Sequence, residues 1–238
     1  MNYNADNKWE TLYSADKDIA YPAEGVIRIF KGKFPNLLMP SNDNGLSILD
    51  LGCGDGRHLP FLNDLGYKVS ATEVSHPISI KIQEKMRSLG IEVNVEAGHA
   101  GNLPFASASF ERLLAWNSCY YMSLGSGRFE DHVAEMARVL KPGGWIIASI
   151  PKKSSFIFSN SEPEKRPGYR IIKDDYFDGL RNGEVMRCIE DVEDLENSFA
   201  HNFNKFCHAD LDLEWFGLRY HWHVFCAQKL SSSDAEES

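Results

Sequence analysis

The sequence predicts an α/β fold built on a doubly wound, mostly parallel sheet with helices on both faces. Strand-like and helix-like segments alternate over the first 150 residues, a pattern typical of parallel sheets. A glycine-rich turn joins the first strong strand to the next helix. The length of 238 residues and the hydrophobic content of 43% fit one sizeable domain with an elaboration.

The first strand of this sheet is predicted at residues 46–51, which are short and apolar, as expected of a strand buried on both faces. Before it, residues 6–35 are expected to form two short helices. The second covers residues 22–34, where Val26 and Phe30 recur at helical spacing. The elements that follow continue the alternation: helices at 57–65, 77–89 and 129–140, and strands at 67–73, 91–96, 110–116 and 145–150.

The regular alternation stops after the fifth strand. Residues 151–217 are richer in Asn, Asp, Glu and Phe, and they are expected to pack as an elaboration over one end of the sheet. A final strand is predicted at 221–229, and the polar tail after it is expected to be disordered. The chain therefore divides into N-terminal helices (1–45), a core (46–150), an elaboration (151–220), the last core strand (221–230) and a tail (231–238).

The charge balance limits the classes of partner. The formal net charge is −9, with 34 acidic against 25 basic side chains. Nucleic-acid binding depends on clustered Lys and Arg, so this balance argues against a nucleic-acid partner and favours a small molecule.

Cysteine usage and apolar runs indicate the compartment. The five cysteines are odd in number and form no C-x-x-C, so we expect neither a disulfide framework nor a zinc site. The pair Cys207-His208 alone offers too few ligands for a metal. No segment has the pattern of a signal peptide or the roughly 20 apolar residues of a membrane span. A cytoplasmic protein without a membrane partner is expected.

The segment 50–56 (DLGCGDG) lies between the first predicted strand and the next helix. Gly52, Gly54 and Gly56 allow the backbone to turn tightly and to approach a ligand closely. Such a turn directs backbone amides into the crevice at the carboxyl ends of the strands, where open α/β sheets bind ligands. A dinucleotide fingerprint would place its third glycine at position 57, where this chain has Arg57, so that pattern is not met.

Glu73 lies at the end of the second predicted strand, 21 residues beyond Gly52. A carboxylate at this place can accept hydrogen bonds from both hydroxyl groups of an unphosphorylated ribose. The alternative is a solvated glutamate at a strand end.

Several motifs then resemble one family. Residues 49–56 are similar to the first motif of the class I S-adenosylmethionine-dependent methyltransferases, and Glu73 matches the ribose-binding acid of that family's second strand. Residues 102–105 (NLPF) with 109–111 (SFE) resemble the family's "LPF…SFD" stretch, and residues 138–144 (RVLKPGG) resemble the segment that leads into its fifth strand. The resemblance implies a Rossmann-like, seven-stranded sheet with an antiparallel last strand, and S-adenosylmethionine as the cofactor.

The resemblance also implies a cofactor site. His99-Ala100 stands where the family often has an acid before Ala. A neutral imidazole can accept the same hydrogen bond from the adenine amino group, and its protonation would weaken cofactor binding below about pH 6; a solvent-facing His99 is the alternative. Trp9, Tyr13 and Tyr21 lie in the predicted N-terminal helices, which in similar small-molecule methyltransferases fold over the cofactor; packing alone would also explain these residues. The expected cofactor residues are Asp50, Gly52, Gly54 and Gly56 at the methionine end, Glu73 at the ribose, Val74, His99 and Ala100 at the adenine, and Trp116 at the boundary with the acceptor.

The catalytic residues are less clearly indicated. Asn117, at the end of the fourth strand, can orient an acceptor group, and Tyr120 or Tyr121 can form a wall of the acceptor site or belong to the core. His221 opens the last strand, whose start lies near the crevice in this family, so His221 is the predicted base.

Other histidines and the nature of the acceptor stay open. His201 and His208 are the next candidates for a base, a structural histidine is an alternative for each, and His132 is expected on the surface. The resemblance favours methyl transfer to a hydroxyl or amine of a sugar-like compound or secondary metabolite, shaped by residues 151–217. A nicotinamide-dependent oxidoreductase and a catalytically silent binding module are the alternatives.

Overall fold

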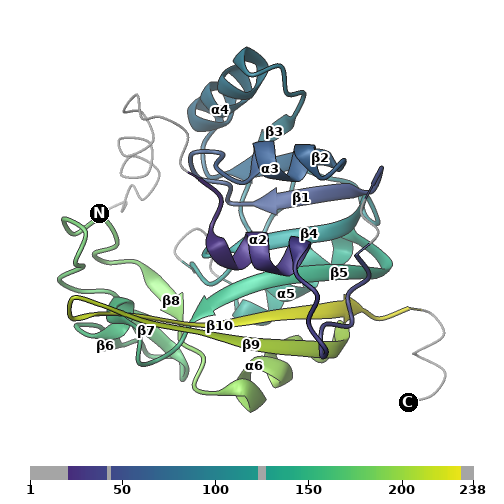
Figure 1. The fold of residues 1–238 in the computed structure, drawn as a ribbon. Coiled ribbons are helices and arrows are strands. Elements are labelled where there is room, and N and C mark those ends of the chain that lie inside the picture. Colours follow the sequence, from purple (N-terminus) through teal and green to yellow (C-terminus); the bar gives the residue numbers. More distant parts are fainter. Residues whose placement is uncertain (1–20, 42–43, 123–126, 232–238) are drawn as a thin grey trace.

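The computed structural model describes residues 21–41, 44–122 and 127–231. Within them a seven-stranded sheet has the order β3-β2-β1-β4-β5-β10-β9 (Figure 1). The predicted first helix, with Trp9 and Tyr13, lies outside the described residues, as do residues 232–238 of the predicted tail. The strands of the sheet are β1 (Ser47–Leu51), β2 (Lys68–Glu73), β3 (Asn94–Ala97), β4 (Phe110–Trp116), β5 (Leu140–Pro151), β9 (Phe203–Trp215) and β10 (Leu218–Lys229).

Strands β1 to β5 are parallel to one another, and β10 is antiparallel to both β5 and β9. The predicted fold class is therefore confirmed, including the antiparallel last strand. The chain builds β1, β2 and β3 outward in one direction and then returns to place β4 on the other side of β1. The crevice at such a switch point, outside the carboxyl ends of β1 and β4, is where open α/β sheets bind ligands.

Helices cover both faces of the sheet. Val26 of α2 (Glu24–Lys31), Leu59 of α3 (Leu59–Asp64) and Ile82 of α4 (His76–Ser88) belong to one apolar cluster with the strands. Phe129 of α5 (Phe129–Val139) and Phe199 of α6 (Val192–Phe199) belong to a second cluster. In Figure 1, α2 lies in front of the sheet and α5 behind it. The two clusters are the two layers of a doubly wound domain.

Strand β9 was not predicted, because its sequence lacks the pattern of a strand. Only Phe203 and Cys207 of its thirteen residues are buried, so the usual alternation of a half-buried strand is missing. It pairs with β10 from Phe203–Lys229 to Trp215–Leu218 and forms the edge of the sheet. Acidic side chains along its exposed half are typical of an edge strand that avoids further pairing.

The part between β5 and α6 forms a small separate sheet at the carboxyl end of β5 (Figure 1). Its β8 is held to the chain after β4 by two backbone hydrogen bonds, from Arg187 N to Tyr120 O and from Met122 N to Val185 O. The elaboration therefore lies over the ligand-binding end of the main sheet. Its elements are η1 (Phe156–Phe158), β6 (Glu162–Pro163), β7 (Tyr169–Ile171) and β8 (Val185–Arg187).

His132 departs from its predicted place on the surface. It is buried in α5, and its Nδ1 lies 3.2 Å from the backbone oxygen of Cys119. Burial lowers the pKa of His132. The surface prediction was wrong because His132 faces the chain that follows β4, which the helical periodicity of α5 alone does not reveal.

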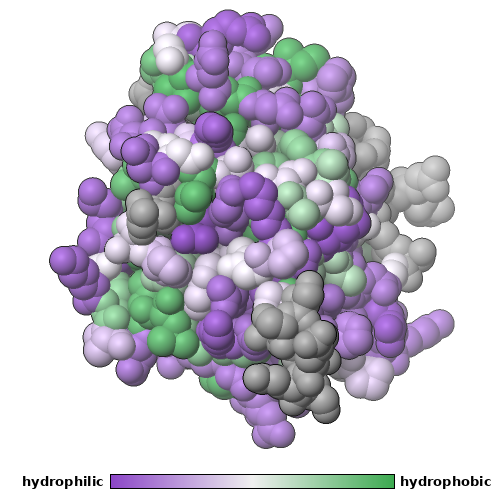
Figure 2. All heavy atoms as spheres, turned by 90° about the vertical axis from the view of Figure 1, so that its right-hand side faces the viewer, coloured by the Kyte–Doolittle hydropathy of each residue, from purple (hydrophilic) through white to green (hydrophobic). Residues whose placement is uncertain are grey.

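The face at which the parallel strands begin is mostly hydrophilic, with several separate apolar patches (Figure 2). This agrees with the excess of acidic residues in the sequence. None of the helices in the described ranges combines the length and apolar character of a membrane span.

Candidate functional site

The backbone of the turn after β1 lies unusually close to the segment that follows β4. Gly52 and Gly54 have φ values of +67° and +63°, in the left-handed region that favours glycine. A Cβ on Gly52 would lie 2.7 Å from the Cβ of Ser118, which follows β4. Conformation therefore favours glycine at both positions, and space also requires it at Gly52.

Glu73 ends β2 beside this turn and is only 5% exposed. Its Oε1 accepts a hydrogen bond from Gly54 N at 2.6 Å, and its Oε2 accepts one from Val74 N at 2.9 Å. Burial raises the pKa of Glu73 from 4.5 to about 7, against the opposing effect of these two hydrogen bonds. The alternative of a solvated glutamate is thus excluded, and the carboxylate lies directly against the glycine-rich turn.

A cavity of about 370 Å³ opens at the carboxyl ends of the strands. Trp116 and Asn117 stand between its two ends, because β4 lies between β1 and the β5–β10 pair in the sheet. One end is formed by the turn after β1 and the start of α3, with Gly52, Cys53, Gly54, Asp55, Arg57 and His58. The other is formed by the elaboration and β10, with Tyr120, Tyr121, Phe156, Ile157, Phe177, Arg181, Leu218, Tyr220 and Trp222.

Buried polar atoms at the turn end of the cavity and beside it have no hydrogen-bond partner among the described residues. Both ring nitrogens of the buried His58 and one carboxylate oxygen of the buried Asp50 make no hydrogen bond, although His58 Nδ1 is 3.4 Å from Asp50 Oδ2. The guanidinium of Arg57 has no hydrogen bond or ion pair among the described residues. Buried polar groups are normally satisfied, so these groups fit a polar ligand at this end. The sequence analysis did not single out His58, which only the fold brings beside Asp50.

Asn117 is held in a strained and well-defined position. Its φ is +59°, unusual for a residue other than glycine. Its backbone N–H donates to Ser149 Oγ at 2.9 Å, its Oδ1 accepts from the same hydroxyl at 2.8 Å, and its Nδ2 donates to Tyr220 Oη at 3.0 Å. Strain that the surroundings hold in place is characteristic of functional sites. Asn117 borders the cavity between its two ends, and its role in orienting an acceptor stays a prediction.

The opposite end of the cavity is aromatic. The rings of Tyr120 and Tyr121 stack with centroids 4.9 Å apart, and those of Tyr220 and Trp222 stack at 3.7 Å. Phe156 lies 5.8 Å from the ring of Trp222. Burial raises the pKa of both Tyr120 and Tyr121, so these two hydroxyls stay protonated near neutral pH. Both tyrosines line the cavity, and their raised pKa values disfavour a role as a base.

Arg181, in the loop between β7 and β8, also borders this end. Its Nη1 donates to both carboxylate oxygens of Asp175, at 2.9 and 3.2 Å, and its Nε donates to Tyr121 Oη at 3.2 Å. Burial alone would lower the pKa of Arg181, but Tyr121, Tyr120 and Asp175 raise it overall. The guanidinium is therefore a permanent and precisely oriented cation.

His221 does not border the cavity. Successive side chains of a strand point to opposite faces, and it is Tyr220 and Trp222 that face the cavity from β10. His221 Nδ1 lies 3.0 Å from Ser154 Oγ, and its Nε2 lies 3.2 Å from Glu214. His208, another candidate, pairs with Glu196 at 2.7 Å. The residue that the sequence analysis missed is Tyr220, one position before the predicted base.

Six of the predicted cofactor residues do not border this cavity: Asp50, Gly56, Glu73, Val74, His99 and Ala100. A Cβ on Gly56 would meet Ile82 at 3.2 Å, so Gly56 serves the packing of α4 against the turn. Val74 is half-buried and Ala100 is buried. His99 is half-buried, and its Nδ1 accepts a hydrogen bond from Gly101 N at 3.2 Å. Adenine contacts by Val74, His99 and Ala100 remain predictions.

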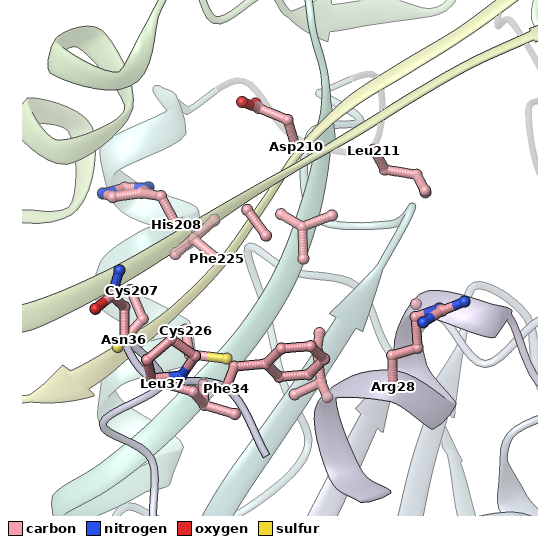
Figure 3. Close-up of a pocket in the computed structure, with 15 residues that line it drawn as sticks. Arg28, Phe34, Asn36, Leu37, Cys207, His208, Asp210, Leu211, Phe225 and Cys226 are labelled. Atoms are coloured by element: carbon pink, nitrogen blue, oxygen red, sulfur yellow. The ribbon is translucent and has the colours of Figure 1, made fainter. Parts of the chain in front are cut away.

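A second cavity of about 350 Å³ lies between α2, the chain that follows it, and strands β9 and β10. Figure 3 shows Phe34, Leu37 and Cys226 close together in it, while His208 and Asp210 extend away from this group. Most of its lining is apolar, and it shares no residue with the glycine-rich turn. The first cavity is therefore the candidate functional site.

Known proteins resemble the part of the chain that contains the glycine-rich turn. Residues 48–144 match the family model described as a methyltransferase domain. An uncharacterized methyltransferase of Bacillus subtilis, YodH, is 31% identical over 108 residues, which are 45% of this chain and 43% of that protein. The chain thus aligns with less than half the length of this curated relative.

Solved structures show the same fold at lower identity. An S-adenosylmethionine-dependent methyltransferase of Methanosarcina mazei has a TM-score of 0.61 and 19% identity, over 80% of this chain and 95% of that one. The 1,6-didemethyltoxoflavin-N1-methyltransferase of Burkholderia thailandensis, solved with its substrate and S-adenosylhomocysteine, has a TM-score of 0.57 and 16% identity, over 79% and 72%. Residues 48–144 thus match a methyltransferase domain, and the described part of the chain has the fold of S-adenosylmethionine-dependent methyltransferases.

Proposed function

We propose that the chain transfers a methyl group from S-adenosylmethionine to a hydroxyl or amine of a small molecule that binds in the aromatic end of the cavity. The observation that carries this proposal is the single cavity joining the glycine-rich turn to Asn117 and Tyr220. A donor at the turn end and an acceptor at the aromatic end would meet beside Asn117. Holding two reactants in this way can lower the barrier by roughly 7–11 kcal/mol.

The turn end fits the cofactor. Glu73 would accept hydrogen bonds from the ribose hydroxyls, in place of or beside the backbone amides of Gly54 and Val74 that it now accepts from. Arg57 would pair with the carboxylate of the methionine part, because it has no anionic partner in the described ranges. The unpaired nitrogens of His58 supply further polar contacts at this end.

When bound, S-adenosylmethionine would supply a methyl group on a sulfonium to the lone pair of an acceptor oxygen or nitrogen; S-adenosylhomocysteine would leave, and the acceptor proton would pass to solvent. The protein's task is alignment and exclusion of bulk solvent. Asn117 fixes Tyr220 through the hydrogen bond from Nδ2 to Oη. Tyr220 is left with its hydroxyl hydrogen for the acceptor, and it is therefore proposed to orient the reacting group.

The test is transfer of the labelled methyl group from S-adenosylmethionine to a small-molecule extract, followed by identification of the labelled product. We expect a labelled small molecule, and we expect S-adenosylhomocysteine but not NAD to raise the melting temperature of the protein. Stabilisation by NAD would favour the oxidoreductase alternative. Stabilisation by S-adenosylhomocysteine with no labelled product from any extract would favour a silent binding module.

A further inference from the structure

The aromatic end of the cavity carries a chemical signature of its acceptor. We propose that the acceptor is a planar aromatic molecule bearing a carboxylate or a similar anionic oxygen, with its ring among Tyr120, Phe156, Tyr220 and Trp222 and its anion at Arg181. This inference rests on the proposed methyl transfer and names the substrate class of the same site.

The shape of this end favours a flat ring. Tyr220 and Trp222 lie stacked with an interplanar angle of 19°, and Phe156 lies nearly parallel to Tyr220, at 28° and 6.4 Å between centroids. Phe177 stands at 74° to Phe156 with 5.7 Å between their centroids. Aromatic walls in both face and edge orientations suit an aromatic guest, which gains from offset stacking on one wall and edge contacts with another.

The polar side chains at this end offer hydrogen-bond donors to a ligand, because their acceptor oxygens already accept hydrogen bonds from the protein. Both oxygens of Asp175, which is 1% exposed on its side chain, accept from Arg181. Asn117 Oδ1 accepts from Ser149, as described above. A sugar needs side-chain acceptors for its several hydroxyl hydrogens. Among the described residues that border this end, only Asn117 carries a carboxylate or amide oxygen, and that oxygen already accepts from Ser149. The site is therefore poorly suited to a sugar.

Two unused donors remain at this end. Arg181 Nη2 makes no hydrogen bond among the described residues, since only Nε and Nη1 are engaged. The Nε1 of Trp222, a residue that is 2% exposed, is buried without a partner. A ligand oxygen with lone pairs and no hydrogen satisfies such donors, and a negatively charged oxygen makes the stronger bond to a guanidinium.

The experiment is a calorimetric titration of the full chain, saturated with S-adenosylhomocysteine, using three matched sets of probes. The isomeric hydroxybenzoates carry a ring and an anion, the hydroxybenzamides carry the same ring without charge, and methyl glucosides represent sugars. We expect at least one hydroxybenzoate to bind, at least about tenfold more tightly than its amide, because hydrogen bonds to charged groups are the stronger ones. The glucosides should not bind measurably.

Variants separate the role of Arg181 from a loss of folding. Arg181→Gln should weaken hydroxybenzoate binding at least about tenfold and amide binding less than threefold. The Arg181→Gln substitution leaves the carboxylate of Asp175 buried without its partner. The double variant Asp175→Asn/Arg181→Gln removes this unpaired charge. It should show the same loss of preference for hydroxybenzoates over hydroxybenzamides. Arg166→Gln is the matched control, because Arg166 pairs with Glu164 in the same elaboration but does not border the cavity.

Each contrary outcome has a clear meaning. Glucoside binding without ring binding, equal affinity for acids and amides, or unchanged discrimination in the Arg181 variants would overturn this inference while S-adenosylhomocysteine still binds. Failure of S-adenosylhomocysteine to bind would overturn the proposed function itself.

Discussion

Glu73 shows how one buried carboxylate links the stability of the fold to its function. It lies against the glycine-rich turn, accepts two backbone hydrogen bonds, and has its pKa raised by burial to about 7. His58, whose ring nitrogens make no hydrogen bond, and the strained Asn117 border the cavity next to this turn. Unsatisfied and strained groups lower stability, so their concentration here indicates a site shaped for binding.

The raised pKa of Glu73 predicts a pH-dependent stability. Between pH 4.5 and about 7 the folded protein keeps a proton on Glu73 that the unfolded chain has lost, so this group's contribution to the free energy of unfolding falls as the pH rises. The full loss corresponds to about 3 kcal/mol, at about 1.4 kcal/mol per pH unit. Urea denaturation between pH 4.5 and 7.5 should show this decline in the parent and a flatter profile in Glu73→Gln. The exposed control Glu84→Gln should show the same decline in the free energy of unfolding as the parent. If Glu73→Gln showed this decline too, the raised pKa of Glu73 would be contradicted.

Tyr220 and His221 make a matched pair, because they are neighbours on β10 that face opposite sides. We expect Tyr220→Phe to reduce kcat/KM for methyl transfer about tenfold while binding of S-adenosylhomocysteine changes less than twofold, since one hydrogen bond of about 0.5–1.5 kcal/mol is lost at the acceptor. His221→Gln should leave the rate within about twofold. Steady-state kinetics with the identified acceptor decides, and a large loss in His221→Gln alone would restore His221 as the predicted base.

At the scale of elements, α2 depends on one small residue to approach the sheet. A Cβ on Gly25 would lie 2.4 Å from Cη2 of Trp116, the residue at the end of β4 that borders the cavity. Helix propensity alone would favour alanine there by about 1 kcal/mol. The close contact opposes this, because neither the helix nor the buried indole can move without disturbing the site.

The contact between Gly25 and Trp116 predicts that a larger residue at position 25 lowers the free energy of unfolding. Gly25→Ala should lower the free energy of unfolding by about 1–2 kcal/mol, because overpacking of about 1–3 kcal/mol exceeds the gain in helix propensity. Adding Trp116→Phe, which removes the crowded ring atoms, should recover part of the loss that Gly25→Ala causes. Thermal melts of the two single variants and the double variant measure this. A Gly25→Ala variant more stable than the parent would show that propensity dominates.

The elements that could be predicted are those whose signal is local. The turn at Gly52 and Gly54, Glu73 and Asn117 could be placed from the sequence because each lies at or directly after the end of a strand with a clear apolar pattern. Strand β9 was missed because most of its side chains are exposed, and the small sheet around Arg181 was missed because its strands have only two or three residues. The acceptor end of the cavity joins residues 117–121, 156–181 and 218–222, and no local pattern relates such distant segments.

At the scale of the whole molecule, β10 is the element that completes the sheet. It lies between β5 and the edge strand β9 and pairs with both over most of its length. It also supplies Tyr220 and Trp222 to the cavity. Strand β10 therefore connects the stability of the core with the aromatic end of the cavity.

Truncation tests this dependence. A chain ending at Gly217 loses all of β10, so both β5 and β9 lose a hydrogen-bonded neighbour and the buried side chains of β10 are removed. We expect no cooperative thermal unfolding of this chain by circular dichroism. A chain ending at Ser231 keeps every described strand and should melt within a few degrees of the parent. Cooperative unfolding of the shorter chain would show that β1 to β5 form a stable unit alone.

The central claim is that the glycine-rich turn and Glu73 together bind the cofactor, and calorimetric titration with S-adenosylhomocysteine tests it most directly. The account predicts that the parent and the exposed control Glu84→Ala bind, while folded Glu73→Ala and Gly54→Val variants bind at least about tenfold more weakly, because a charge-assisted hydrogen bond or the open turn is lost. Equal affinity in all four proteins would contradict the claim.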